Sequence, residues 1–205
     1  METGRLVVGV TGASGAIYAK RFLLEAAKRW QEIYLIMSDQ AIQVAHTELG
    51  AQIEREAFST EEWLGADLPH IRLLPTRNYF TPPASGTFMH DGMVVIPCSM
   101  GTAGRIANGI SDDLLTRSAD VCLKEGRPLV VVPREMPMNT IMLRNLATLS
   151  ECGVRVIPAC PAFYHRPATF DELADTVVAK VMQALGQKQL LVKEWMHEAP
   201  AIDRE

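Results

Sequence analysis

Short runs of β-branched and other apolar residues alternate along the chain with longer segments in which apolar residues recur every three or four positions. The short runs predict strands at residues 6–10, 33–37, 93–96, 129–132 and 154–157. The periodic segments predict helices at residues 17–30, 39–49, 102–108, 112–125 and 139–150. Residues 50–90 give no clear pattern, and the stretch TPPASGTFMHDG within them predicts a loop because of its Pro and Gly content.

A final helix is predicted to begin after Thr169, because Thr169 and Glu172 have the spacing of a capping box. One apolar stripe follows at helical intervals: Leu173, Val177, Val181 and Leu185. The alternation of strands and helices predicts an α/β fold, a three-layer Rossmann-like (flavodoxin-like) parallel sheet with helices on both faces. We expect one domain over residues 1–186 and a C-terminal tail, 187–205, that docks on a neighbouring subunit.

The composition excludes several classes of protein. The chain has 205 residues with a net charge of −4, so no nucleic-acid partner is expected. No apolar stretch approaches the roughly 20 residues that span a bilayer, so no membrane partner is expected either. The four cysteines form no C-x-x-C pair, which predicts reduced thiols in a cytoplasmic protein. The histidines lack metal-ligand spacing, so no metal site is expected.

The first strand leads into a glycine-rich loop, GVTGASGA, at residues 9–16. In parallel α/β sheets ligands bind beyond the carboxyl ends of the strands, and a helix N-terminus there favours an anion. The loop therefore favours a phosphate ligand over the alternative, a tight turn without one. It is not G-x-G-x-x-G, and neither a P-loop motif nor a Tyr-x-x-x-Lys pair occurs. A dinucleotide-binding protein has an acidic residue directly after the second strand, where it binds the ribose. Here Ser38 holds that position and Asp39 follows it, so the sequence leaves dinucleotide binding ambiguous.

Two later strands are also followed by polar residues. Ser99 and Thr102 suit a mononucleotide such as FMN, and equally suit a helix cap with small residues for packing. Arg134 can grip a phosphate with two nitrogens, and Glu135 can move a proton, although a surface ion pair is the alternative. Tyr164, in PAFYHRP, offers a phenol to a phosphate, or packs half-buried.

Taken together, long motifs in the same order resemble the UbiX-type flavin prenyltransferases. They are GVTGASGAIYAKR, LIMS, SGTF, VIPCSMGTAGRIANGISDDLLTRSADVCLKEGRPLVVVPREMP and PACPAFYHRP, and they cover nearly the whole chain to about Leu185. The resemblance implies a Rossmann-type homo-oligomer, a dodecamer with active sites at subunit contacts. It also implies metal-independent transfer of a dimethylallyl group from dimethylallyl phosphate to N5 and C6 of reduced FMN. The prenylated FMN then serves UbiD-type decarboxylases.

The resemblance also implies roles for particular residues. FMN is expected to contact Gly12, Ala13, Ser14, Ser38, Ser99, Met100, Gly101, Thr102 and Arg134. The catalytic residues are expected to be Arg134, Glu135, Tyr164 and Lys180, and further substrate contacts are expected from Glu48, Arg117, Lys124, Tyr164 and Lys180. Trp195 is a candidate for stabilising an allylic cation. Many relatives have Lys in place of Gly101, and Arg is usual in place of Lys180.

Two alternative functions stay open at this point. An FMN-dependent cysteine decarboxylase would share the fold, but such proteins carry a PASANT-like motif and an upstream catalytic histidine. Here the motif is PCSMGT, and neither His70 nor His90 has the expected setting. A non-catalytic flavin carrier, or an accessory subunit of a decarboxylase, would bind FMN without prenyl transfer. A carrier would need no second phosphate site, so Tyr164 and Lys180 argue against it.

Overall fold

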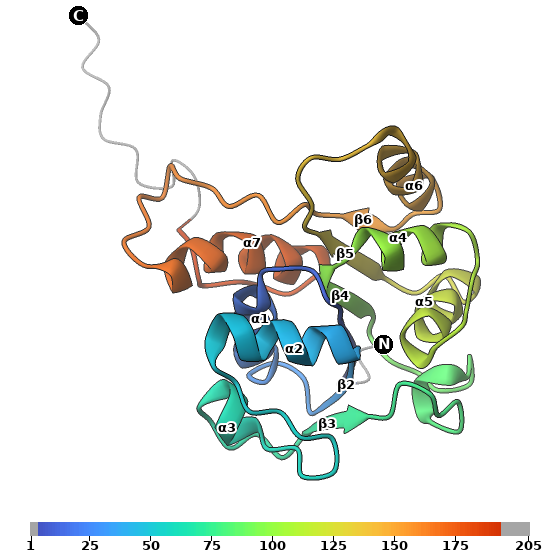
Figure 1. Cartoon of the computed structure of the whole chain (residues 1–205), viewed down its shortest axis with the longest axis horizontal. Coiled ribbons are helices and arrows are strands. Elements are labelled where there is room, and N and C mark those ends of the chain that lie inside the picture. The colour runs from blue at the N-terminus through green and yellow to red at the C-terminus, as the bar shows by residue number, and fades with distance from the viewer. Residues whose placement is uncertain (1–3, 194–205) are drawn as a thin grey trace, which may run out of the picture.

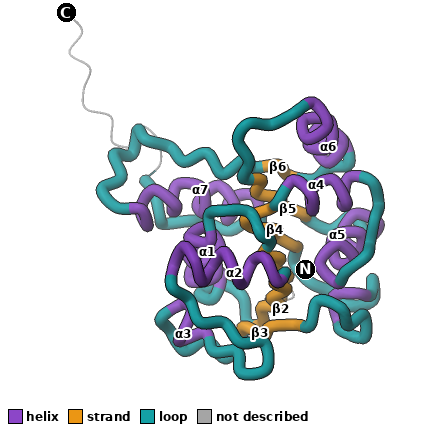
Figure 2. Tube along the Cα trace, viewed as in Figure 1, coloured by secondary structure: helices purple, strands orange, loops and turns teal. Residues whose placement is uncertain are grey.

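The computed structural model describes residues 4–193, which form a three-layer α/β fold (Figures 1 and 2). Six parallel strands make one sheet in the order β3-β2-β1-β4-β5-β6. Their bounds are β1 Arg5–Val10, β2 Glu32–Met37, β3 Ile71–Leu74, β4 Met93–Cys98, β5 Leu129–Pro133 and β6 Arg155–Val156. This is the strand order of the Rossmann fold, and the predicted three-layer architecture is confirmed.

Helices cover both faces of the sheet, because β1, β2, β4 and β5 are apolar on both sides. The helices are α1 Ala16–Ala26, α2 Asp39–Leu49, α3 Thr60–Leu64, α4 Met100–Ala107, α5 Leu114–Lys124, α6 Thr140–Glu151 and α7 Phe170–Ala184, with the 3₁₀ turn η1 Pro82–Ala84. Residues from α1, α2, α3 and α7 form one apolar cluster with Leu6, Val8 and Val10 of β1. Residues from α4, α5 and α6 form the other, with Val7 of β1.

The main differences from the predicted elements are in residues 50–90, where the structure has α3, η1 and the edge strand β3. These elements are three to five residues long and only partly buried, so they leave a weak periodic signal. Helix α1 ends at Ala26, not at residue 30, although Trp30 is still buried and its Nε1 donates to Asp91 Oδ2 at 3.1 Å. Residues 194–205, including Trp195, lie outside the described residues, so the docking of the tail stays a prediction.

A half-formed capping box starts α7. The Thr169 hydroxyl accepts the backbone N–H of Glu172 at 3.1 Å, as predicted. The Glu172 carboxylate, however, accepts the N–H of Ala168 at 2.6 Å rather than that of Thr169. Glu172 therefore stabilises the loop before the helix as well as the helix itself.

A largely buried ion pair joins α1 to α7. Arg21 donates to both carboxylate oxygens of Asp175, at 2.8 and 2.6 Å, and the Asp175 side chain is only 10% exposed. Because Asp175 lies among the apolar residues that α7 buries, each partner would be left poorly solvated without the other. The pair therefore fixes how the two helices lie side by side.

We predict that Asp175→Asn lowers the free energy of unfolding by about 2 kcal/mol, because it removes the charged, largely buried acceptor and leaves Arg21 only its longer, exposed pair with Asp171 at 3.5 Å. Urea unfolding followed by circular dichroism measures the change. The matched control is Glu32→Gln, which breaks the more exposed pair with Arg5 and is expected to cost less than about 1 kcal/mol. Equal losses in the two variants would contradict the role given to the buried pair.

Candidate active site

The predicted ligand-binding loops meet at the carboxyl edge of the sheet, where Thr11 joins two of them. Its hydroxyl donates to the carbonyl oxygen of Pro97 at 2.8 Å and accepts the backbone N–H of Ser99 at 2.7 Å. Thr11 is buried, so these bonds face little competition from water. The sequence places Thr11 among the residues after the first strand, where a ligand is expected, but assigns it no contact of its own. Its position directly after the first strand, at the start of the glycine-rich loop, was the available signal.

Arg134 brings in a third loop, the one after β5. Its Nε donates to the carbonyl oxygen of Ser14 at 3.0 Å, and its backbone N–H donates to the carbonyl oxygen of Cys98 at 3.3 Å. The guanidinium therefore lies against the first loop, as its predicted contact with FMN requires. Tyr18 lies nearby: burial raises the pKa of its phenol, the neighbouring Cys160 thiol raises the pKa further, and the Arg134 charge opposes both.

Glu48 caps the helix that follows the first loop. One of its carboxylate oxygens accepts the backbone N–H groups of Gly15 at 2.9 Å and Ala16 at 2.7 Å. The N-cap residue of α1 is Gly15, with a φ of 108°, and glycine has no side chain that could cap the helix. A side chain at Gly15 would be strained, and its Cβ would lie 2.8 Å from the Tyr18 ring. The Glu48 carboxylate therefore occupies the place at the N-terminus of α1 where an anion would otherwise bind.

Serine hydroxyls cap the two other helices at this edge. Ser38 Oγ accepts the N–H of Ala41 at 3.1 Å at the start of α2. Ser99 Oγ accepts the N–H of Thr102 at 3.3 Å and donates to the Thr102 hydroxyl at 3.0 Å at the start of α4. Helices α1, α2 and α4 therefore all begin at the edge where the loops meet (Figure 1). The N-terminus of each helix favours negative charge there.

The remaining predicted residues of these loops differ in how they meet solvent. Ala13 and Met100 are each 6% exposed and belong to the interior, and their contacts with FMN stay predictions. A Cβ at Gly12 would lie 2.4 Å from Cβ of Gln40, so the first loop packs closely on the start of α2. Gly101 is exposed, and a side chain there would meet open space. A longer residue, such as the Lys of many relatives, would fit.

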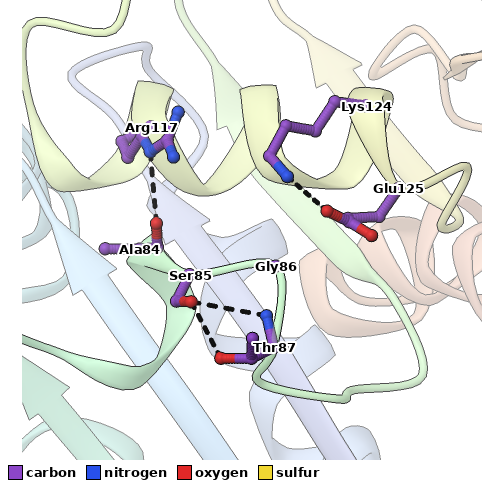
Figure 3. A pocket seen from close by; sticks show the side chains of 7 residues that line it. All are labelled: Ala84, Ser85, Gly86, Thr87, Arg117, Lys124 and Glu125. Carbon is purple, nitrogen blue, oxygen red and sulfur yellow. Dashed lines mark hydrogen bonds and ion pairs between the residues drawn. The ribbon is translucent and has the colours of Figure 1, made fainter.

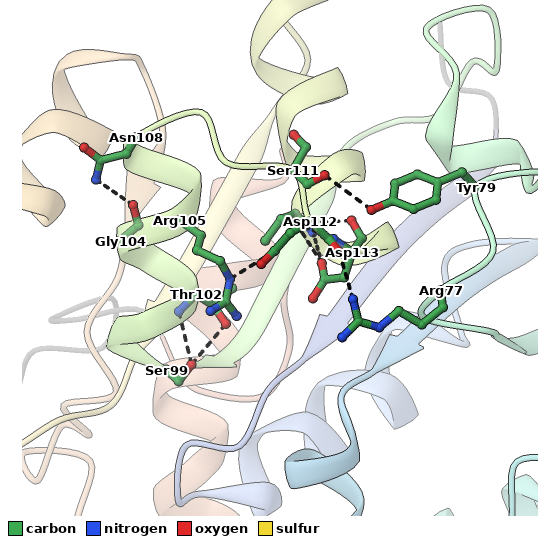
Figure 4. A network of polar contacts seen from close by, with 11 residues as sticks. Arg77, Tyr79, Ser99, Thr102, Gly104, Arg105, Asn108, Ser111, Asp112 and Asp113 are labelled. Carbon is green, nitrogen blue, oxygen red and sulfur yellow. Dashed lines mark hydrogen bonds and ion pairs between the residues drawn. The ribbon is translucent and has the colours of Figure 1, made fainter.

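A polar network braces the α4–α5 loop behind this edge (Figure 4). Arg105 of α4 forms an ion pair with Asp112 at 3.4 Å. From the segment before η1, Arg77 donates to the carbonyl oxygen of Asp112 at 3.1 Å, and Tyr79 donates to that of Ser111 at 3.3 Å. These contacts connect three separate stretches of chain and support the placement of α4.

Arg117 and Lys124 lie elsewhere, in a cavity of about 430 Å³ whose wall includes residues 84–87 and Glu125 (Figure 3). Lys124 forms an ion pair with Glu125, and Arg117 pairs with Asp120 at 2.7 Å and donates to the carbonyl oxygen of Ala84 at 3.1 Å. Residues 84–92 lead into the amino end of β4. Within one chain Lys124, at the C-terminal end of α5, is therefore on the amino side of the sheet, away from the glycine-rich loop, whereas Arg117 lies about one turn after the start of α5.

Tyr164, Glu135 and Lys180 come from three different segments of the chain: the loop before α7, the loop after β5, and α7 itself. Tyr164 is 52% exposed, and its ring lies 4.1 Å from that of His165, centroid to centroid. The Glu135 carboxylate accepts the N–H of Met136 at 3.1 Å. Lys180 is exposed on α7, about 15 Å along the helix from its start at 1.5 Å per residue. The roles given to these three side chains stay predictions.

Within residues 4–193, none of the helices is long and apolar enough to cross a bilayer. In the same stretch, His, Cys, Asp and Glu form no group of three or more that could hold a metal ion.

Comparison with known proteins identifies the family. The flavoprotein family model matches residues 1–186. A flavin prenyltransferase UbiX of Halalkalibacterium halodurans is 42% identical over 195 residues, which are 95% of this chain and 95% of that protein. A dodecameric FMN-dependent UbiX-like decarboxylase from Escherichia coli O157:H7 superposes with a TM-score of 0.82 at 38% identity, over 93% of this chain and 98% of that one. AnUbiX (PadA1), solved with FMN and dimethylallyl pyrophosphate, superposes with a TM-score of 0.82 at 33% identity, over 93% and 96%.

The Rossmann strand order and the joined loops at its carboxyl edge define a protein built to bind a phosphorylated ligand. The chain belongs to the flavoprotein family and, within it, to the UbiX-type flavin prenyltransferases, which are enzymes of the prenyltransferase class.

We predict that Thr11→Val lowers the free energy of unfolding by about 1–3 kcal/mol, because it leaves the buried N–H of Ser99 without an acceptor. Thr11→Ser keeps the hydroxyl and is expected to retain most of the stability. Urea unfolding of both variants measures the difference.

Thr47→Val is the matched control, because it removes an exposed hydroxyl that donates to a helix carbonyl at 2.8 Å and accepts no loop N–H. Its free energy of unfolding is expected to stay within about 0.5 kcal/mol of wild type. If Thr11→Val were as stable as this control, the hydroxyl would not be what joins the two loops.

Proposed function

We propose that this enzyme binds reduced FMN at the carboxyl edge of the sheet and joins a dimethylallyl group to N5 and C6 of the flavin. The donor is dimethylallyl phosphate, and the prenylated FMN serves UbiD-type decarboxylases in the cytoplasm. The observation that carries the proposal is the joining of the loops after β1, β4 and β5 by Thr11 and Arg134. Relatives that are 42% and 43% identical over 95% and 93% of this chain are flavin prenyltransferases by name.

The residues at this edge fit a flavin mononucleotide. Because Glu48 fills the N-terminus of α1, the N-termini of α2 and α4 are left for the FMN phosphate, with the hydroxyls of Ser38 and Ser99 beside them. Arg134 lies against the first loop and supplies a fixed positive charge. AnUbiX, with a TM-score of 0.82 to this chain, has been solved with FMN, which supports the same cofactor here.

Prenyl transfer requires that the allylic C–O bond break and that a phosphate dianion leave. Arg134, Tyr164 and Lys180 are the groups proposed to stabilise that charge through hydrogen bonds and Coulomb attraction. Glu135 is proposed to hold or move the proton released as the new bonds to the flavin form. Reduced FMN supplies the electron-rich ring that the dimethylallyl carbon joins.

The positions of the charged groups favour a site shared between subunits. Lys124 is at the end of α5 that leads to the amino end of β5, whereas Arg134 follows the carboxyl end of β5, so a site that uses both would draw them from two copies. β4, which separates the two edges, spans six residues, or about 20 Å. The similar Escherichia coli protein is dodecameric, which supports an oligomer of the same kind here.

The test of the activity is the mass of the flavin after anaerobic incubation with reduced FMN and dimethylallyl phosphate. We expect the flavin to gain one five-carbon prenyl unit. Tyr164→Phe and Glu135→Gln are each expected to slow the gain about 100-fold, the size typical of losing one charge-stabilising or proton-transferring group. Dimethylallyl pyrophosphate is run in parallel to identify the preferred donor.

An unchanged flavin mass with FMN bound, and with both donors tried, would refute prenyl transfer and favour the carrier function. Release of carbon dioxide from a cysteine-containing peptide in place of prenylation would favour the decarboxylase. Full activity in both variants would leave prenyl transfer standing but remove the roles given to Tyr164 and Glu135.

Mixed oligomers test whether the site is shared. When inactive Lys124→Ala and inactive Tyr164→Phe chains are co-expressed in equal amounts, about a quarter of the wild-type activity should return. In that case each site takes Lys124 from one chain and Tyr164 from another. Each of the two side chains is intact in about half of the chains, so about a quarter of the sites have both.

The control mixes Lys124→Ala chains with chains that carry both substitutions, and no activity should return there. A lack of recovery in the first mixture as well, with intact oligomers by size-exclusion chromatography, would show that both groups act within one chain.

A further inference from the structure

The loop that carries Tyr164 is tied to α7 on both sides of the tyrosine. Before it, the backbone N–H of Ala162 donates to the Thr176 hydroxyl at 2.9 Å. After it, the N–H of Ala168 donates to the Glu172 carboxylate at 2.6 Å. Between these points the chain makes a tight turn, in which the N–H of Arg166 donates to the carbonyl oxygen of Phe163 at 2.9 Å.

The two ties differ in how well water can replace them. Thr176 is 4% exposed, and its hydroxyl proton is committed to the carbonyl oxygen of Leu173 at 2.7 Å. Its oxygen is therefore held ready to accept the Ala162 N–H. Glu172 is exposed, so water competes for its bond to Ala168. Thr176 is the stronger constraint on the loop.

α7 itself is anchored next to this hydroxyl. Asp175, the neighbouring residue, forms the bidentate ion pair with Arg21 of α1, and α1 begins at the glycine-rich loop. A path of hydrogen bonds and helix packing therefore leads from the predicted FMN site, through α1 and α7, to the turn that presents Tyr164. The backbone turn sets the point and direction from which the Tyr164 side chain extends, and so helps to decide where its hydroxyl lies.

We infer that Thr176 is a positioning residue for the prenyl donor: its buried hydroxyl fixes the Tyr164 turn, so that the phenol meets the donor phosphate. The inference rests on the proposed function, because it takes Tyr164 as a phosphate ligand. It assigns to Thr176 an effect on donor binding and none on flavin binding.

Thr176→Val removes the acceptor and keeps the shape of the side chain, whereas Thr176→Ser keeps the hydroxyl. We expect Thr176→Val to raise the KM for dimethylallyl phosphate about tenfold, as for a buried donor that loses its acceptor. The dissociation constant for reduced FMN should stay within about twofold of wild type. Thr176→Ser should restore the KM, as measured by the rate of flavin mass gain at varied donor concentration.

Thr60→Val is the matched control. Thr60 is also buried, and its hydroxyl accepts a loop N–H, that of Leu68, at 2.8 Å. The two valine variants are expected to lower the melting temperature by similar amounts, but only Thr176→Val should change the KM for the donor. A similar KM in both valine variants, or a failure of Thr176→Ser to restore it, would overturn the inference.

A double variant tests whether Thr176 acts through Tyr164. If it does, Tyr164→Phe/Thr176→Val should have the same donor KM as Tyr164→Phe alone, because the turn then has no phenol to present. Independent, multiplied effects on KM would overturn the inference. So would an unchanged KM in Tyr164→Phe while the wild type still prenylates FMN. Failure of the wild type to prenylate FMN at all would instead refute the proposed function.

Discussion

The carboxyl edge of the sheet depends on one buried hydroxyl, that of Thr11. It accepts the N–H of Ser99 and donates to the carbonyl oxygen of Pro97, and so joins the loops after β1 and β4. Each of these loops leads into a helix whose N-terminus favours an anion or a fixed acceptor, such as Glu48 at α1 and Ser99 at α4. Arg134 then holds the loop after β5 against the first loop, and the three loops form one surface.

The charges of the molecule are arranged around this surface in a way that a single chain leaves incomplete. Glu48 supplies the negative charge for α1, which leaves α2 and α4 for a phosphate. The cations proposed for a second phosphate are spread along the chain, with Arg134 after the carboxyl end of β5 and Lys124 at the end of α5 that leads to the amino end of β5. Within one chain Arg117 pairs with Asp120, and Lys124 pairs with Glu125.

Phosphate release from an allylic donor is usually assisted by a metal ion, and the proposed site relies on side chains instead. Without a metal ion, the exact position of each side chain matters more than how tightly it binds the phosphate, because hydrogen bonds and charge interactions weaken quickly with distance and angle. The supports of these side chains are accordingly extensive. A network around Asp112 braces α4, an ion pair joins α1 to α7, and Thr176 and Glu172 hold the turn around Tyr164.

The sequence by itself determined the central strands, most helices and the cap at Thr169, because these follow from local periodicity and local hydrogen bonds. It also indicated which residues follow the strands, and hence Ser14 and Arg134. Only the tertiary structure decided that Thr11 meets Ser99, 88 residues away, that Glu48 caps α1, and that Lys124 is far from Arg134. Those relations depend on strand order and on which helix covers which face, and no local pattern encodes either one.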